Sequence, residues 1–145
     1  KPEDRGGQLP KAILQHLRFG ASGGGGSSQF LSVTHAQAQA GTDGWRFSAR
    51  CRRLHPIDKP WHVRVRLKYA RDGGGGDNVR ALGGIQAEGA TREQITNGVA
   101  FLEFPPDVER ATVKGWTDPT RLPAIGIRGS VVLQIEGEAG GIPDA

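Results

Sequence analysis

Two stretches of the chain alternate between apolar and polar residues, and this alternation constrains the fold more than any other feature. The first spans 45–52 and the second 61–69. Side chains of a strand point alternately to opposite faces, so each stretch predicts a β-strand with one apolar and one basic face. The connection over 54–60 carries two prolines and is predicted to be a loop, across which the two strands would pair antiparallel.

Further strand signals recur along the chain at intervals of about 8–12 residues, a spacing typical of sandwiches and barrels. Asn97-Gly98 is a strong two-residue hairpin signal. The other predicted strands span 30–34, 79–85, 94–96, 99–104, 110–116 and 130–136. We therefore expect an all-β fold, an antiparallel β-sandwich of about seven to nine strands with one short N-terminal helix.

The length of 145 residues suits one domain with a polar segment before it. Ile13, Leu14 and Leu17 form an apolar stripe at helical spacing, and Gly20 is suited to end that helix. Two glycine tetrads, at 23–26 and 73–76, predict flexible glycine-rich loops, the second within a loop over 71–78. The predicted organisation is a flexible arm over 1–8, a helix over 9–20, a Gly/Ser linker over 21–28, the sandwich over 29–138 and a tail over 139–145.

Several classes of protein are not expected. No apolar run approaches the roughly 18 residues that a membrane span needs, and the first residues lack the apolar core of a secretion signal. The single cysteine, Cys51, excludes an internal disulfide and a cysteine-based zinc site. These features favour a cytoplasmic protein. The absence of methionine leads us to expect a processed product or a fragment of a larger protein.

No residue pattern predicts catalysis, a metal or a cofactor. Residues 20–24 match the G-x-S-x-G string of a nucleophile elbow, but the preceding strand and following helix that this elbow needs are not predicted. The four histidines, His16, His35, His55 and His62, do not have the spacing of a metal-binding pair. Cys51 alternates with Phe47 and Ala49 and is therefore expected in the core. We expect a non-enzymatic protein.

The charge is distributed very unevenly along the chain. Residues 46–71 hold nine Lys or Arg and one acidic residue, whereas residues 72–145 hold six Lys or Arg and eleven acidic residues. If the two alternating strands are neighbours, their basic faces form one cationic surface. Arginine suits bidentate contacts to phosphate or carboxylate. The candidate anion-binding residues are Arg46, Arg50, Arg52, His62, Arg64, Arg66 and Lys68.

Three interpretations of this basic surface remain open. In the first, the chain is an accessory domain that binds nucleic-acid phosphates; base stacking is not expected, because aromatic residues do not alternate with the arginines. In the second, it is a structural domain that docks on an acidic protein surface, including that of another copy; the expected exposure of Trp116 fits this interpretation. In the third, the surface is only solvated, with Glu103, Glu136 and Glu138 as internal partners.

The stretch over 45–72 resembles the second and third strands of C2 domains. The resemblance rests on Leu54, Asp58 and the Pro-Trp-x-Val-x-Val pattern over 60–65, and it continues weakly over 111–118 and 125–127. It implies a β-sandwich and contact with anionic phospholipid. A calcium-binding C2 site needs several aspartates on two loops, and only Asp58 and Asp118 stand at matching places. Lipid contact would therefore have to occur without calcium.

Overall fold

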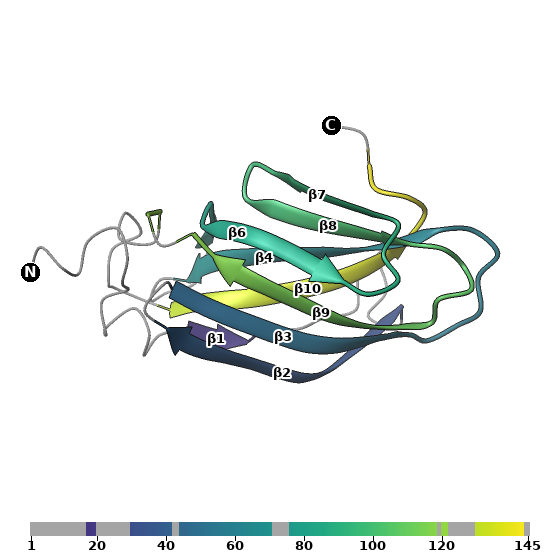
Figure 1. The fold of residues 1–145 in the computed structure, drawn as a ribbon, viewed down its shortest axis with the longest axis horizontal. Coiled ribbons are helices and arrows are strands. Elements are labelled where there is room, and N and C mark those ends of the chain that lie inside the picture. Colours follow the sequence, from purple (N-terminus) through teal and green to yellow (C-terminus); the bar gives the residue numbers. More distant parts are fainter. Residues whose placement is uncertain are drawn as a thin grey trace, which may run out of the picture.

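The computed structural model describes residues 17–19, 30–41, 44–70, 76–118, 120–121 and 130–143. These residues form ten β-strands and no helix, so the predicted all-β class is confirmed (Figure 1). The strands are β1 (Leu17–Phe19), β2 (Leu31–Gly41), β3 (Gly44–Arg53), β4 (Trp61–Ala70), β5 (Gly76–Val79), β6 (Leu82–Ala87), β7 (Arg92–Thr96), β8 (Val99–Phe104), β9 (Arg110–Thr117) and β10 (Ser130–Ala139). Among the described residues there is accordingly no helix of the length and apolarity that a membrane crossing requires.

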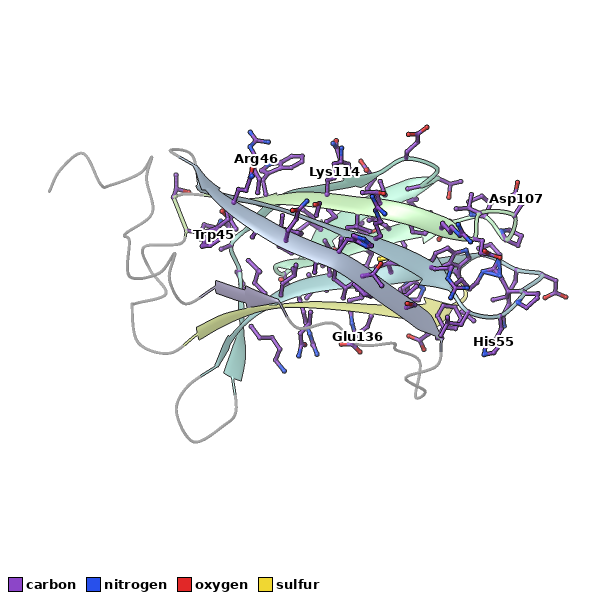
Figure 2. All side chains as sticks on the ribbon, turned by 90° about the horizontal axis from the view of Figure 1, so that it is seen from below. Trp45, Arg46, His55, Asp107, Lys114 and Glu136 are labelled. Carbon is purple, nitrogen blue, oxygen red and sulfur yellow. The ribbon has the colours of Figure 1, made fainter. Side chains whose placement is uncertain are left out.

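The strands form two sheets that face each other as two layers (Figures 1 and 2). The six-stranded sheet has the order β1-β10-β4-β8-β7, with β5 also paired to β4. The four-stranded sheet has the order β2-β3-β9-β6. All described pairings are antiparallel except that of β1 with β10, which is parallel. The predicted antiparallel sandwich is therefore confirmed, with one parallel edge strand.

The core fills the space between the two sheets, because the alternating apolar side chains of both sheets point inward. Phe47 and Cys51 of β3 face Val63 and Leu67 of β4 across this space, and all four are buried. Burying an apolar side chain of this size contributes roughly 1.5–3 kcal/mol. Trp61 is fully buried and stacks on the Phe104 ring, with 4.6 Å between ring centroids.

Arg53 closes one end of the sandwich. Its side chain is only 6% exposed, and its guanidinium donates hydrogen bonds to the carbonyl oxygens of His55, at 2.7 Å, and Pro106, at 3.0 Å. The same group lies 5.9 Å from the centre of the Trp61 ring. One side chain thus ties the β3–β4 connection to the β8–β9 connection.

The predicted hairpin at Asn97-Gly98 is confirmed. The two residues join β7 to β8 with φ values of +53° and +79°, the left-handed conformation that a type I′ turn requires at both positions. Glycine is needed at the second position also because a Cβ there would lie 2.8 Å from the Arg80 Cα.

Several predicted boundaries are corrected by the structure. The helix predicted over 9–20 is not confirmed: residues 17–19 form β1, and the rest of that range lies outside the described residues. The strand predicted over 79–85 is in fact two strands, since β5 ends at Val79 and β6 begins at Leu82 in the other sheet. The loop predicted over 71–78 includes the first residues of β5, and its residues 71–75 are not described.

The predicted terminal and linker segments are described only in part. The arm over 1–8 and the linker over 21–28 lie outside the described residues. In the predicted tail, Gly140 donates its N–H to the Pro60 carbonyl oxygen at 2.7 Å. Ile142 is buried and donates its N–H to Glu103 Oε1 at 2.7 Å. The described part of the tail is therefore attached to the end of the six-stranded sheet.

Candidate functional site

The seven residues predicted to form one basic surface lie on two different faces of the molecule. The prediction that 45–52 pairs with 61–69 is wrong: β3 pairs with β2 and β9, whereas β4 pairs with β10, β5 and β8. The connection over 54–60 passes from one sheet to the other. Arg46, Arg50 and Arg52 are therefore on the outer face of the four-stranded sheet, and His62, Arg64, Arg66 and Lys68 are on the six-stranded sheet. Figure 2 shows Arg46 and Glu136 pointing away from opposite layers.

Two cations of the six-stranded sheet, Arg64 and Arg66, share one carboxylate of β10. Arg64 Nη2 lies 2.9 Å from Glu136 Oε2, and Arg66 Nη2 lies 3.4 Å from Glu136 Oε1. Arg66 Nε also donates a hydrogen bond of 2.9 Å to Gln134 Oε1. These pairs form because β10 lies beside β4 with Glu136 directly opposite Arg64. On this face the structure favours the interpretation in which acidic residues serve as internal partners, as predicted for Glu136.

His62 is buried and contacts other parts of the protein, so it is not placed to bind an external anion. The residue is buried, and its Nδ1 is within hydrogen-bond distance, 2.9 Å, of the Gly140 carbonyl oxygen. Its Nε2 lies 3.9 Å from Glu138 Oε2. Lys68 is half-buried further along the same strand. His62 therefore helps to hold the C-terminal segment on the sheet.

The four-stranded sheet gains further cations from β9. In the antiparallel ladder Arg46 lies opposite Trp116, Ser48 opposite Lys114, and Arg52 opposite Arg110. Even-numbered residues of both strands point outward, because odd-numbered residues of both strands face the core. We call this surface the cationic face; its charged strand residues are Arg46, Arg50, Arg52, Arg110 and Lys114.

The cationic face has almost no internal counter-charge. None of the outward residues on its described strands is acidic. Among the residues that the structure describes, no carboxylate lies within 4 Å of the side-chain nitrogens of Arg46, Arg50, Arg52 or Lys114. Arg110 does contact Glu109, at 3.5 Å, but both side chains are largely exposed, so water screens this pair strongly.

The same face is hollowed at both ends. At one end a hollow of about 810 Å³ is lined by Arg50, Arg52 and Arg110, with Thr34 and His35 from β2. His35 reaches this hollow from an irregularity in the β2–β3 pairing, where its φ is +54°. Glu88, after β6, contributes one carboxylate to the rim. This end therefore combines three guanidinium groups with hydroxyl groups.

At the other end a hollow of about 260 Å³ contains an exposed aromatic ring. It is lined by Arg46, Lys114 and Trp116 together with the amide side chains Gln37, Gln39 and Gln86. Trp116 is 37% exposed, and its indole lies across the backbone of Gly83 and Gly84 on β6. Cationic, amide and aromatic groups thus meet in one shallow site.

Sequence reasoning missed Arg110 and Lys114 as members of the site. It expected Trp116 to be exposed, but it did not place the ring beside the arginines and therefore did not expect base stacking. The strand over 110–116 was predicted, and its alternation of small or apolar residues at 111, 113 and 115 identifies the even positions as outward-facing. The alternation does not show which strand lies beside this one. The sequence therefore predicts which residues point outward, but it does not predict that the strand pairs with β3.

Other chemistry has little support in the described part of the chain. No three side chains among its His, Cys, Asp and Glu residues gather as metal ligands would. Burial raises the pKa of the Cys51 thiol from its ordinary value of 9.0 to about 12, which disfavours the thiolate that a nucleophile needs. Asp58 lies in the connection after Arg53, the last residue of β3. Asp118 follows Thr117 of β9, whose hydroxyl oxygen accepts a hydrogen bond from the N–H of Trp45, near the first residue of β3. The two aspartates of the C2 resemblance are therefore far apart.

Comparisons with known proteins identify no family for this chain. No protein-family model and no curated protein matches it. Among solved structures, the fold is similar to the chitin-binding domain of a chitinase from Pyrococcus furiosus, with 16% identity and a TM-score of 0.35. The alignment covers 74% of this chain and 95% of that domain. A likeness of this degree assigns no ligand, and it does not test the resemblance to C2 domains, which stays a prediction.

Proposed function

We propose that the chain is a non-catalytic binding domain whose cationic face contacts the phosphates of a nucleic acid. The observation that supports this most strongly is the contrast between the two outer faces. Arg64 and Arg66 of the six-stranded sheet are paired with Glu136, whereas four cations of the cationic face have no carboxylate partner among the described residues. Cations that are left unpaired on one face are available to an external anion.

The geometry of the face suits an extended polyanion better than a single small anion. From Arg46 to Arg52 is six residues of extended strand, or about 20 Å at roughly 3.3 Å per residue. Four of its five cations are arginines, which make bidentate contacts to phosphate oxygens. A polyanion bound along β3 and β9 would contact both hollows and release counterions, so that binding would weaken as salt rises.

The test compares two triple variants that remove the same number of charges from opposite faces. Arg46→Gln/Arg50→Gln/Lys114→Gln alters the cationic face, and Arg64→Gln/Arg66→Gln/Lys68→Gln alters the six-stranded sheet. Binding to an oligonucleotide is measured by fluorescence anisotropy across a salt series. The first variant should lose most of its affinity, and the slope of log K against log salt should fall by roughly 0.7–0.9 for each phosphate contact removed. The second should bind like the parent.

Two results would overturn the proposal. One is a parent chain that fails to bind nucleic acid even at low salt, including the case in which it self-associates or binds anionic vesicles instead. The other is an equal loss of affinity in both triple variants, which would mean that total charge matters and the cationic face does not. Circular dichroism of each variant confirms that the β-fold is retained before binding is compared.

A further inference from the structure

Trp116 stands apart from the other two tryptophans of the chain. Trp45 and Trp61 are buried in the core, whereas Trp116 is 37% exposed on the cationic face. Across the ladder its partner is Arg46, and Lys114 lies two residues before it on the same strand. Proteins that bind single-stranded nucleic acids combine aromatic rings with cations, because bases stack on the rings while the cations contact the phosphates.

The backbone of β6 supports the indole from below. A Cβ at Gly84 would lie 2.0 Å from Trp116 Cζ2, and one at Gly83 would lie 3.2 Å from Trp116 Cδ1. The ring therefore occupies the space that side chains at these two positions would fill. The indole can lie here because Gly84 has no side chain. In this position Trp116 keeps more than a third of its surface exposed to solvent.

The groups around Trp116 complement a nucleobase rather than a phosphate alone. Three glutamine side chains line the same hollow, Gln37 and Gln39 from β2 and Gln86 from β6. An amide side chain both donates and accepts hydrogen bonds, as the edges of all four bases do. In a duplex the base faces are already stacked on one another, so a ring on a sheet surface has no base face to contact.

We infer that Trp116 stacks on an unpaired base and that the cationic face consequently prefers single-stranded over duplex nucleic acid. This inference rests on the proposed function and adds the form of nucleic acid that is bound. The distance from Arg46 to Arg52, about 20 Å when estimated from strand rise, is long enough for several nucleotides of such a strand. One base of such a strand would lie on Trp116, and its phosphates would follow β3 and β9.

The experiment uses three probes that differ in their bases: an oligothymidylate, a duplex of the same length, and an abasic strand that keeps the phosphates. The variants are Trp116→Ala, Trp116→Phe and Ile95→Ala, the last removing an apolar side chain of similar exposure from the other sheet. Trp116→Ala should weaken oligothymidylate binding about 5- to 140-fold, with an unchanged salt slope. Its affinity for the abasic strand and the duplex should stay the same, Trp116→Phe should retain most binding, and Ile95→Ala should change nothing.

The outcomes separate this inference from the proposed function. If Trp116→Ala leaves oligothymidylate binding unchanged, or weakens abasic binding as much, the inference is wrong while phosphate binding by the face still stands. If the parent binds none of the three probes, the proposed function fails and the inference fails with it. Salt-independent binding of an uncharged polysaccharide that Trp116→Ala removes would assign the ring to sugars and would also overturn the inference.

Discussion

Arg52 and Arg110 occupy directly opposed positions in the β3–β9 ladder, so that two arginines form a cross-strand pair. Like charges at opposed positions destabilise a sheet, by roughly 0.2–1 kcal/mol relative to neutral pairs. The fold tolerates this cost at the rim of the larger hollow, where both residues contribute to the lining. A cost in stability at the place that would bind an anion is the compromise expected of a binding surface.

We therefore predict that Arg52→Thr stabilises the protein and weakens its binding to polyanions. Threonine favours extended backbone and removes the repulsion from Arg110, so the free energy of unfolding should rise by about 0.2–1 kcal/mol at low salt. Urea denaturation measures the gain, which should shrink as salt screens the repulsion.

The matched control is Arg92→Thr on β7. Arg92 lies opposite Glu103 rather than another cation, so the same substitution there relieves no like-charge repulsion and should not stabilise the protein. If Arg52→Thr and Arg92→Thr change the free energy of unfolding equally, strand propensity explains the effect and charge does not.

A second prediction concerns the contact between Gly84 and Trp116. Gly84→Ala places a Cβ where the indole now lies and should cost about 1–3 kcal/mol, the usual cost of overpacking. In a Trp116→Ala background the obstructing ring is absent, so the same substitution should cost little. A double-mutant cycle by urea denaturation measures this coupling, and additive effects of the two substitutions would contradict the contact.

A third prediction concerns the buried Arg53. Arg53→Met should lower the free energy of unfolding by about 2–4 kcal/mol, because the carbonyl oxygens of His55 and Pro106 lose charge-assisted hydrogen bonds. Arg52→Met, at the exposed neighbouring position, is the control and should not destabilise the protein. Thermal unfolding of the two variants compares them, and equal stability would mean that Arg53 does not tie the two connections together.

A fourth prediction follows from the buried thiol of Cys51. Its pKa is raised in the folded protein from 9.0 to about 12, so the folded state holds the proton more tightly than the unfolded state. The contribution of this thiol to the free energy of unfolding is fully present below about pH 9. It is lost as the pH rises toward about 12, at up to about 1.4 kcal/mol per pH unit. Cys51→Ala should therefore show a shallower decline of stability over this range, and identical declines would contradict the prediction.

Local patterns sufficed to predict much of the fold. The alternation over 45–52 and 61–69 correctly predicted both strands and the inward position of Cys51, because side-chain period reports directly on which face is buried. The Asn97-Gly98 turn was predictable because few dipeptides adopt two successive positive φ values.

Strand pairing was not predictable in the same way. The connection over 54–60 is equally compatible with a hairpin and with a passage between sheets, and alternation is the same in both cases. The choice is made by contacts distant in sequence, such as Arg53 with Pro106 and Arg64 with Glu136. For that reason the candidate site was predicted with the correct outward residues of β3 but with the wrong partner strand.

Charge is distributed unequally over the two sheets, so the two outer faces of the molecule differ electrostatically. Glu136 offsets part of the positive charge on one outer face, whereas the other face keeps four cations without a carboxylate partner among the described residues. A polyanion approaching in solution would rotate the domain before contact, so that productive encounters exceed those expected for random orientation. The opposite side, the six-stranded sheet, would then stay exposed to solvent while the polyanion is bound.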